Sequence, residues 1–160
     1  MERRDCDALV LFGATGDLCY RKIYPSLYDL VRRGLLTVPV IGVARAGWTQ
    51  EQFGEHVRKS MKEFVPKREE EVVTRFVSLL KYVDGDYKER TTFESLKKAL
   101  GGATRPLNYL AIPPSVFPVV IEHLGTAIST DARVVIDMRT IDPADDVRVS
   151  GALATVFAAN

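Results

Sequence analysis

The chain has 160 residues, of which 46% are hydrophobic and 27% are charged, and its formal net charge is +1. This length and composition suit one domain with a packed core, and the balanced charge gives no reason to expect a nucleic acid or an anionic membrane as a partner. No apolar run approaches the roughly 18 residues of a membrane span, and we expect no signal peptide. The two cysteines, Cys6 and Cys19, form no metal-binding or disulfide framework, which favours a reduced, cytoplasmic protein.

The most informative stretch lies near the N-terminus, where the apolar run Ala8–Phe12 leads into a turn that begins with Gly13. An apolar run that ends at a glycine predicts a buried strand. Residues 18–33 then have the apolar spacing of a helix, which Pro25 should kink or divide and Gly34 should cap. Strand, turn and helix together predict a phosphate cradle. The small turn lets backbone N–H groups approach a phosphate, and the helix N-terminus adds about half a positive charge.

The glycine pattern is Gly13-x-x-Gly16-x-x-Cys19, which differs from the usual G-x-G-x-x-G pattern of dinucleotide-binding folds. Its last position, usually a glycine or an alanine for close helix–strand packing, is the small residue Cys19. No Gly-Lys-Ser/Thr follows, so the turn is not a Walker A loop. An ordinary tight turn is the alternative, but the strand before it and the helix after it favour a nucleotide as the ligand.

Strand and helix patterns alternate along the chain. Strands are predicted at residues 8–12, 38–43, 107–112 and 133–136. Helices are predicted at residues 18–33, 49–64 with a capping box at Thr49 and Gln52, 69–82, from Thr91 or Thr92 to Gly101, 115–125 and 144–159. Such alternation implies parallel strands with right-handed crossovers. We therefore expect an α/β protein with a Rossmann-like, doubly wound, mostly parallel sheet in a single three-layer domain over residues 1–160.

Four segments in a fixed order carry a family resemblance. Residues 13–25 read Gly-Ala-Thr-Gly-Asp-Leu-x-x-Arg-Lys-Ile-Tyr-Pro. The others are Val-Ile-Gly-Val-Ala-Arg at 40–45, Tyr-Val-Asp-Gly-Asp-Tyr at 82–87 and Tyr-Leu-Ala-Ile-Pro-Pro at 109–114. Together they resemble the N-terminal part of the glucose-6-phosphate dehydrogenase family, over about residues 8–136. The resemblance implies NADP-dependent oxidation of glucose 6-phosphate to 6-phosphogluconolactone, the first step of the pentose phosphate pathway.

Two parts of the chain are predicted to line the dinucleotide. The glycine turn should hold the diphosphate through Gly13, Ala14, Thr15, Gly16, Asp17 and Leu18. The carboxyl end of the strand at 107–112 lies where ligands bind in open α/β sheets, and the resemblance places Ala111 and Pro113 beside the nicotinamide. Asp17 is unusual beside an anion, so capping of the helix start by its carboxylate is favoured over a ligand contact.

Arg45 follows the second predicted strand, where a dinucleotide fold meets the adenosine ribose. An acidic residue there favours NAD, whereas an arginine accommodates the 2′-phosphate of NADP. No Asp or Glu adjoins the strand end at Ala44 and Arg45, so NADP is the expected cofactor, and a solvent-exposed surface arginine is the alternative. In the family, the lysine at the place of Lys22 reaches the sugar substrate; a surface lysine is the alternative here.

The resemblance weakens after the strand at 133–136. Met138 stands where the family has a substrate-contacting lysine, and the family segment with a catalytic histidine has no counterpart. His56 and His123 fall inside predicted helices, where surface or partly buried positions are favoured over catalysis. Hydride transfer from a sugar hydroxyl needs a base. We therefore expect the family's C-terminal substrate domain to be absent and the chain alone not to oxidise glucose 6-phosphate.

Two alternatives stay open. The chain could be a non-catalytic NADP(H)-binding or regulatory module, or a small dehydrogenase that acts on another sugar through an unrecognised base. Turnover of glucose 6-phosphate, and a survey of sugar phosphates with NADP, separate these hypotheses. In the family, the second domain packs on the carboxyl-end face of this sheet. Without that domain an apolar face should be exposed there, and such a face favours association into a homo-oligomer.

Overall fold

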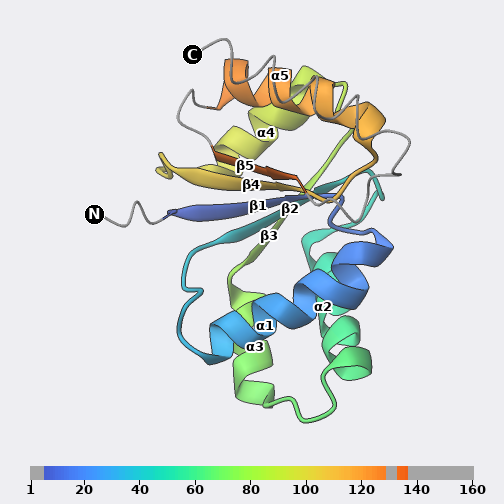
Figure 1. The fold of residues 1–160 in the computed structure, drawn as a ribbon, viewed down its shortest axis with the longest axis vertical. Helices are drawn as coiled ribbons and strands as arrows, with labels where there is room; N and C mark the ends of the chain where they lie inside the picture. Colours follow the sequence, from blue (N-terminus) through green and yellow to red (C-terminus); the bar gives the residue numbers. More distant parts are fainter. Residues whose placement is uncertain (1–5, 129–132, 137–160) are drawn as a thin grey trace.

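The computed structural model describes residues 6–128 and 133–136. Within these residues, the centre of the protein is a five-stranded sheet in the order β3-β2-β1-β4-β5 (Figure 1). The strands are β1 (Ala8–Phe12), β2 (Val40–Ala44), β3 (Leu80–Asp84), β4 (Pro106–Leu110) and β5 (Arg133–Ile136). Neighbouring strands are parallel, and the strand order reverses between β1 and β4. This reversal is the switch point at which doubly wound α/β proteins bind their ligands.

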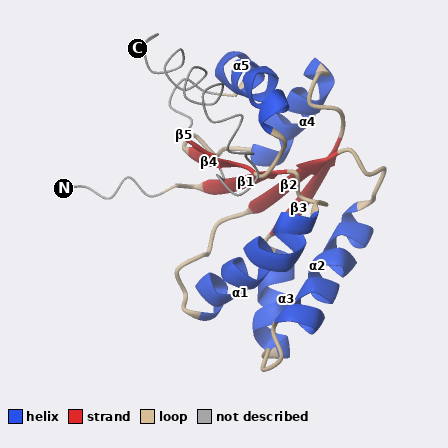
Figure 2. Cartoon of the chain, turned by 45° about the vertical axis from the view of Figure 1, so that its right-hand side comes forward, coloured by secondary structure: helices blue, strands red, loops and turns tan. Residues whose placement is uncertain are grey.

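Helices cover both faces of the sheet. The helical segments are η1 (Cys19–Ile23), α1 (Tyr24–Arg32), α2 (Gln50–Phe64), α3 (Glu70–Ser78), α4 (Arg90–Leu100), η2 (Pro114–Val116) and α5 (Phe117–Ala127). Figures 1 and 2 show α1, α2 and α3 on one side of the sheet and α4 and α5 on the other. The fold is therefore the three-layer, Rossmann-like α/β arrangement that the sequence predicts.

The continuous apolar run of β1 follows from its central place in the sheet. Leu9 and Leu11 belong to the core on the side of α1, α2 and α3. Ala8, Val10 and Phe12 belong to the core on the side of α4 and α5. All five are at most 7% exposed. A strand that is buried on both faces needs apolar residues at every position, which is why β1 is confirmed with its predicted limits.

Three local predictions concern helix ends, and those at Gly34 and Thr49 are confirmed. Pro25 lies in the first turn of α1, where its missing N–H removes no helical hydrogen bond. The helix predicted at 18–33 changes there from the π-helical turn η1 to α1, without a break in the helical backbone. Gly34 follows α1 with a left-handed φ of 71°, and backbone hydrogen bonds close a Schellman cap around it. The capping box between Thr49 and Gln52 is present at the start of α2.

The prediction of one helix over residues 69–82 is wrong. The helix α3 ends at Ser78, and the chain then forms the strand β3 at the edge of the sheet. The buried apolar residues of β3 are Leu80 and Val83. In the sequence they continue the helical apolar spacing of α3, so they were predicted as part of the same helix. No glycine or proline separates the two elements, so the periodicity runs across the boundary.

Other limits differ by smaller amounts. The second and third predicted strands are β2 and β4, with ends within two residues of the predicted ones. Glu89 occupies the N-cap position of α4, so neither Thr91 nor Thr92 caps that helix. The helix predicted at 115–125 is divided into η2 and α5. The helix predicted at 144–159 lies outside the described residues.

Part of the apolar surface stays uncovered on the α1 side of the sheet. An apolar hollow of about 360 Å³ is lined by residues of β1, α1 and β4, including Leu107 and Tyr109. Val135, which pairs in register with Tyr109, is 39% exposed, and Leu35 is 63% exposed. This surface is not the apolar face expected at the carboxyl end of the sheet, so that face and self-association stay predictions. Among the described helices, none combines the length and the apolar character that crossing a membrane requires.

Candidate functional site

The first half of the glycine turn is packed inside the protein at the switch point. Gly13 has a φ of 84°, a left-handed conformation that favours glycine. A Cβ atom added to Gly13 would lie 2.2 Å from the carbonyl oxygen of Ala111. Ala14 is fully buried in the core beneath the turn. These two residues bring the backbone against the end of β4. The backbone of Ala14 is itself hydrogen-bonded, since its N–H donates to the carbonyl of Val43 at 3.3 Å and its carbonyl accepts the hydroxyl of Tyr24, so a cofactor contact from Ala14 stays a prediction.

The second half of the turn opens to solvent. Thr15 is half-buried, and Gly16 and Asp17 are exposed. A hollow of about 470 Å³ lies beside them and is lined by Thr15, Gly16, Asp17, Tyr20, His56 and Lys59, among others. A Cβ atom added to Gly16 would meet only the carbonyl oxygen of Gly13, at 3.2 Å. The helical segment starts here, since the N–H of Tyr20 donates to the carbonyl of Gly16 at 3.1 Å. An accessible backbone at a helix start favours an anion.

The prediction that Asp17 caps this helix is wrong. Its carboxylate accepts a hydrogen bond from Nε of Arg21 at 2.8 Å, one turn further along. No side chain caps the start of η1. The pairing places a positive charge beside Asp17 and reduces its repulsion of a phosphate. A contact between Asp17 and a cofactor stays a prediction, as does one from Leu18. Cys19 is fully buried, as a position of close helix–strand packing requires.

At the end of β2, the structure brings together residues that the sequence analysis treated separately. Arg45 is exposed, but its Nη1 lies 2.7 Å from Oδ2 of Asp86, in the loop after β3. An acid therefore adjoins Arg45 in space, although none does so in the sequence. Because β3 was predicted as helix, the sequence analysis missed this neighbour. The family-like segment at 82–87 was the signal that could have found it.

A second carboxylate fastens the backbone next to Arg45. Oδ1 of Asp84 accepts the N–H groups of Ala46 at 3.0 Å and Gly47 at 2.8 Å, and the hydroxyl of Tyr82 at 2.8 Å. Burial opposes ionisation, but these hydrogen bonds outweigh it and hold the pKa of Asp84 below its usual range. The loop that carries Arg45 is therefore fixed by the neighbouring strand.

Tyr87 is hydrogen-bonded to the glycine turn, and the sequence analysis did not predict this contact. Its hydroxyl accepts the N–H of Gly13 at 2.7 Å and donates to the carbonyl of Val43 at 3.0 Å. Burial is the main cause that raises the pKa of Tyr87 to about 12. The phenol thus stays protonated and links the turn to the end of β2.

Tyr87→Phe should lower the free energy of unfolding by about 1 kcal/mol, because it removes two hydrogen bonds of the phenol, while the N–H of Gly13 keeps its hydrogen bond to the carbonyl of Val43 at 3.0 Å. Chemical denaturation followed by circular dichroism measures this change. Tyr20→Phe is the control, since it removes only an exposed hydrogen bond to Glu63 and should change stability by less than about 0.5 kcal/mol. Equal stability of Tyr87→Phe and the unmodified chain would contradict this role.

The predicted nicotinamide end lies beside the packed half of the turn. Ala111 directly follows β4 and is half-buried, with its N–H donating to the carbonyl of Phe12 at 3.0 Å. Pro113 is exposed at the start of η2. Lys22 is exposed on η1. Met138 lies outside the described residues, so the substitution at its place has no structural account.

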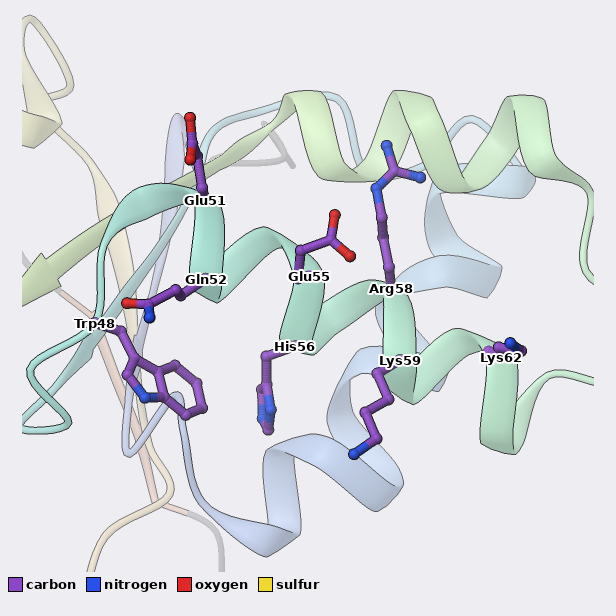
Figure 3. A pocket seen from close by; sticks show the side chains of 8 residues that line it. All are labelled: Trp48, Glu51, Gln52, Glu55, His56, Arg58, Lys59 and Lys62. Atoms are coloured by element: carbon purple, nitrogen blue, oxygen red, sulfur yellow. The ribbon is translucent and has the colours of Figure 1, made fainter.

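A larger hollow of about 720 Å³ continues along α2 (Figure 3). Figure 3 shows Trp48, His56 and Lys59 on the same side of this helix. The ring centroid of His56 lies 4.8 Å from that of Tyr20 and 4.8 Å from that of Trp48. Burial, and then the charge of Lys59, lower the pKa of His56. Its place agrees with the prediction of a partly buried helical histidine, and His123 is likewise half-buried in α5.

These features define a class of protein. A doubly wound parallel sheet, a glycine turn at its switch point and an arginine at the end of β2 are typical of a dinucleotide-binding domain. A family model described as "Glucose-6-phosphate dehydrogenase, NAD binding domain" matches residues 10–138. The chain belongs to the glucose-6-phosphate dehydrogenase family and corresponds to the dinucleotide-binding domain of its members.

Known members of the family are similar in sequence. Cytoplasmic glucose-6-phosphate 1-dehydrogenase 6 of Arabidopsis thaliana is 33% identical over 134 residues, and glucose-6-phosphate 1-dehydrogenase 1 of Mycobacterium tuberculosis is 35% identical over 132 residues. The matches cover 76% and 82% of this chain but only 26% and 28% of the relatives. The chain therefore spans about a quarter of the length of these relatives.

Solved structures agree with this assignment. Glucose-6-phosphate 1-dehydrogenase from Mycobacterium avium has a TM-score of 0.82 at 30% identity, over 96% of this chain and 34% of that one. A glucose-6-phosphate dehydrogenase in complex with its substrate glucose-6-phosphate has a TM-score of 0.79 at 28% identity, over 98% of this chain and 36% of that one. The fold is thus the same as in the corresponding part of these enzymes.

Proposed function

We propose that this chain binds NADP at its glycine turn and acts as the cofactor-binding domain of a cytoplasmic enzyme that oxidises glucose 6-phosphate to 6-phosphogluconolactone. This reaction opens the pentose phosphate pathway. The observation that carries the proposal is the exposed backbone of Gly16 at the switch point, beside the packed Gly13. Family membership and the names of the relatives support the reaction and the location.

The residues present fit a dinucleotide. The turn offers an accessible backbone and the hydroxyl of Thr15 next to an open hollow, and Arg45 offers a guanidinium that suits a phosphate. The proposed cofactor contacts are Gly13, Ala14, Thr15, Gly16, Asp17, Leu18, Arg45, Ala111 and Pro113. Lys22, exposed on η1, is the proposed contact to the sugar phosphate.

When bound, NADP accepts the hydride from C1 of the sugar. The residues of this chain contribute binding and orientation: the turn fixes the diphosphate, and the chain after β4 fixes the position of the nicotinamide. Such orientation contributes a large part of the barrier reduction in a hydride transfer. Hydride transfer also needs a base that takes the hydroxyl proton. The family segment that carries a catalytic histidine has no counterpart in residues 1–160. We therefore expect residues 1–160 alone to bind NADP without oxidising glucose 6-phosphate.

Arg45→Ala tests the cofactor assignment. We expect it to weaken NADP binding about tenfold and to leave NAD binding nearly unchanged, because NAD has no 2′-phosphate for the guanidinium to bind. Titration calorimetry with each cofactor on the purified chain measures both affinities.

Arg32→Ala is the matched control for Arg45→Ala. Arg32 is also exposed and also pairs with a carboxylate, that of Asp29 at 2.6 Å, but it lies at the end of α1 that leads to the amino end of β2. It should leave both affinities unchanged. Equal losses of NADP and NAD binding in Arg45→Ala would overturn the role of Arg45 at the 2′-phosphate. No binding of either cofactor by the unmodified chain would overturn the proposed function.

A further inference from the structure

The loop between β3 and α4 holds a carboxylate against the guanidinium of Arg45. Oδ2 of Asp86 lies 2.7 Å from Nη1 of Arg45, and Oδ1 accepts the backbone N–H of Lys88 at 2.9 Å. The side chain of Asp86 is 28% exposed, whereas that of Arg45 is 75% exposed. The carboxylate is therefore anchored to its own loop, and the long arginine side chain reaches it from the solvent side.

The other acid in this region cannot take this role. Asp84 is occupied by the N–H groups of Ala46 and Gly47 and by the hydroxyl of Tyr82. It holds the loop backbone, while Asp86 neutralises the charge of Arg45. Asp84 and Asp86 therefore have separate roles at the end of β2.

This arrangement affects the two cofactors differently. A 2′-phosphate that binds Arg45 has to share the guanidinium with Asp86 or displace it, and it brings negative charge close to the carboxylate. The 2′-hydroxyl of NAD carries no charge and leaves the ion pair intact. Asp86 therefore penalises NADP and not NAD.

We propose that Asp86 is a specificity-determining residue that acts through Arg45 and lowers the preference of the site for NADP over NAD. The site then accepts both cofactors, with a smaller preference than Arg45 alone would give. This inference rests on the proposed function, because it requires the adenosine ribose to lie at the end of β2.

Asp86→Asn tests the inference, since asparagine keeps an oxygen for the N–H of Lys88 but loses the charge. We expect the ratio of NADP affinity to NAD affinity to rise about fivefold, with NAD affinity unchanged. Titration calorimetry on the full chain measures both constants. Asp86→Glu retains the charge and should leave the ratio within about twofold of the original. Asp29→Asn, which breaks the remote ion pair with Arg32, should leave both affinities unchanged.

A double variant distinguishes competition for Arg45 from a general charge effect. In the Arg45→Ala background, Asp86→Asn should change the ratio by less than about twofold, because the guanidinium that links the two groups is gone. An equal rise in both backgrounds would overturn the inference. An unchanged ratio in Asp86→Asn, with both cofactors still bound, would overturn the inference and leave the proposed function standing. Absence of binding in the unmodified chain would overturn both.

Discussion

Replacing Gly16 by valine should abolish dinucleotide binding while the protein keeps its fold. Gly16 is exposed, and the only atom near an added Cβ is the carbonyl oxygen of Gly13, at 3.2 Å. Gly16 lines the hollow beside Thr15, so a valine side chain would take up space where we propose that the diphosphate approaches the backbone. We expect a loss of roughly hundredfold or more for NADP and NAD alike, equivalent to about 3 kcal/mol. Calorimetry measures the affinities, and circular dichroism checks the fold.

Gly102→Val is the control for this substitution. Gly102 is another exposed glycine, and no atom lies within 4 Å of an added Cβ. It lies between α4 and β4, at the amino edge of the sheet and away from the turn. This variant should bind both cofactors normally. If folded Gly16→Val bound them normally as well, the turn would be a structural feature only and the cofactor site would lie elsewhere.

The N-terminal part of the site could be predicted because its determinants are local. The apolar run Ala8–Phe12, the glycine that follows it and the caps at Gly34 and Thr49 act over a few residues. Burial of β1 on both faces then fixes its limits. The contact of the Asp17 side chain could not be predicted in this way. Its carboxylate can either cap the helix or pair with Arg21, and only the position of the Arg21 side chain in the structure shows that it pairs.

The neighbours of the turn could not be predicted because they depend on long-range pairing. Arg45 and Asp86 are 41 positions apart, and Gly13 and Tyr87 are 74 positions apart. Both contacts require β3 to lie beside β2. The helical periodicity of α3 runs into β3, and this edge strand has too few buried residues to show a period of its own. One misassigned element therefore hid the acid beside Arg45 and the phenol beneath the turn.

Gly13→Ala should destabilise the protein far more than any change at the open half of the turn. The left-handed φ of 84° costs a residue with a Cβ atom about 1–2 kcal/mol. The added Cβ would also lie 2.2 Å from the carbonyl oxygen and 2.9 Å from the carbonyl carbon of Ala111. The clashing atoms of Ala111 belong to the backbone and cannot rotate away as the end of a flexible side chain can. The carboxyl ends of β1 and β4 would therefore have to move apart at the switch point. We expect the free energy of unfolding to fall by at least about 3 kcal/mol, a large share of the total for a domain.

Gly34→Ala separates the cost of the left-handed φ from the cost of the clash with Ala111. Gly34 has a similar φ of 71°, but no atom lies within 4 Å of an added Cβ. Its substitution should therefore cost only the conformational part, about 1 kcal/mol. The difference between the two variants in a chemical denaturation experiment then measures the close approach of the turn to Ala111. Equal losses would mean that the turn does not press against the end of β4, and the cradle would lack the rigid support that holds its open half toward a ligand.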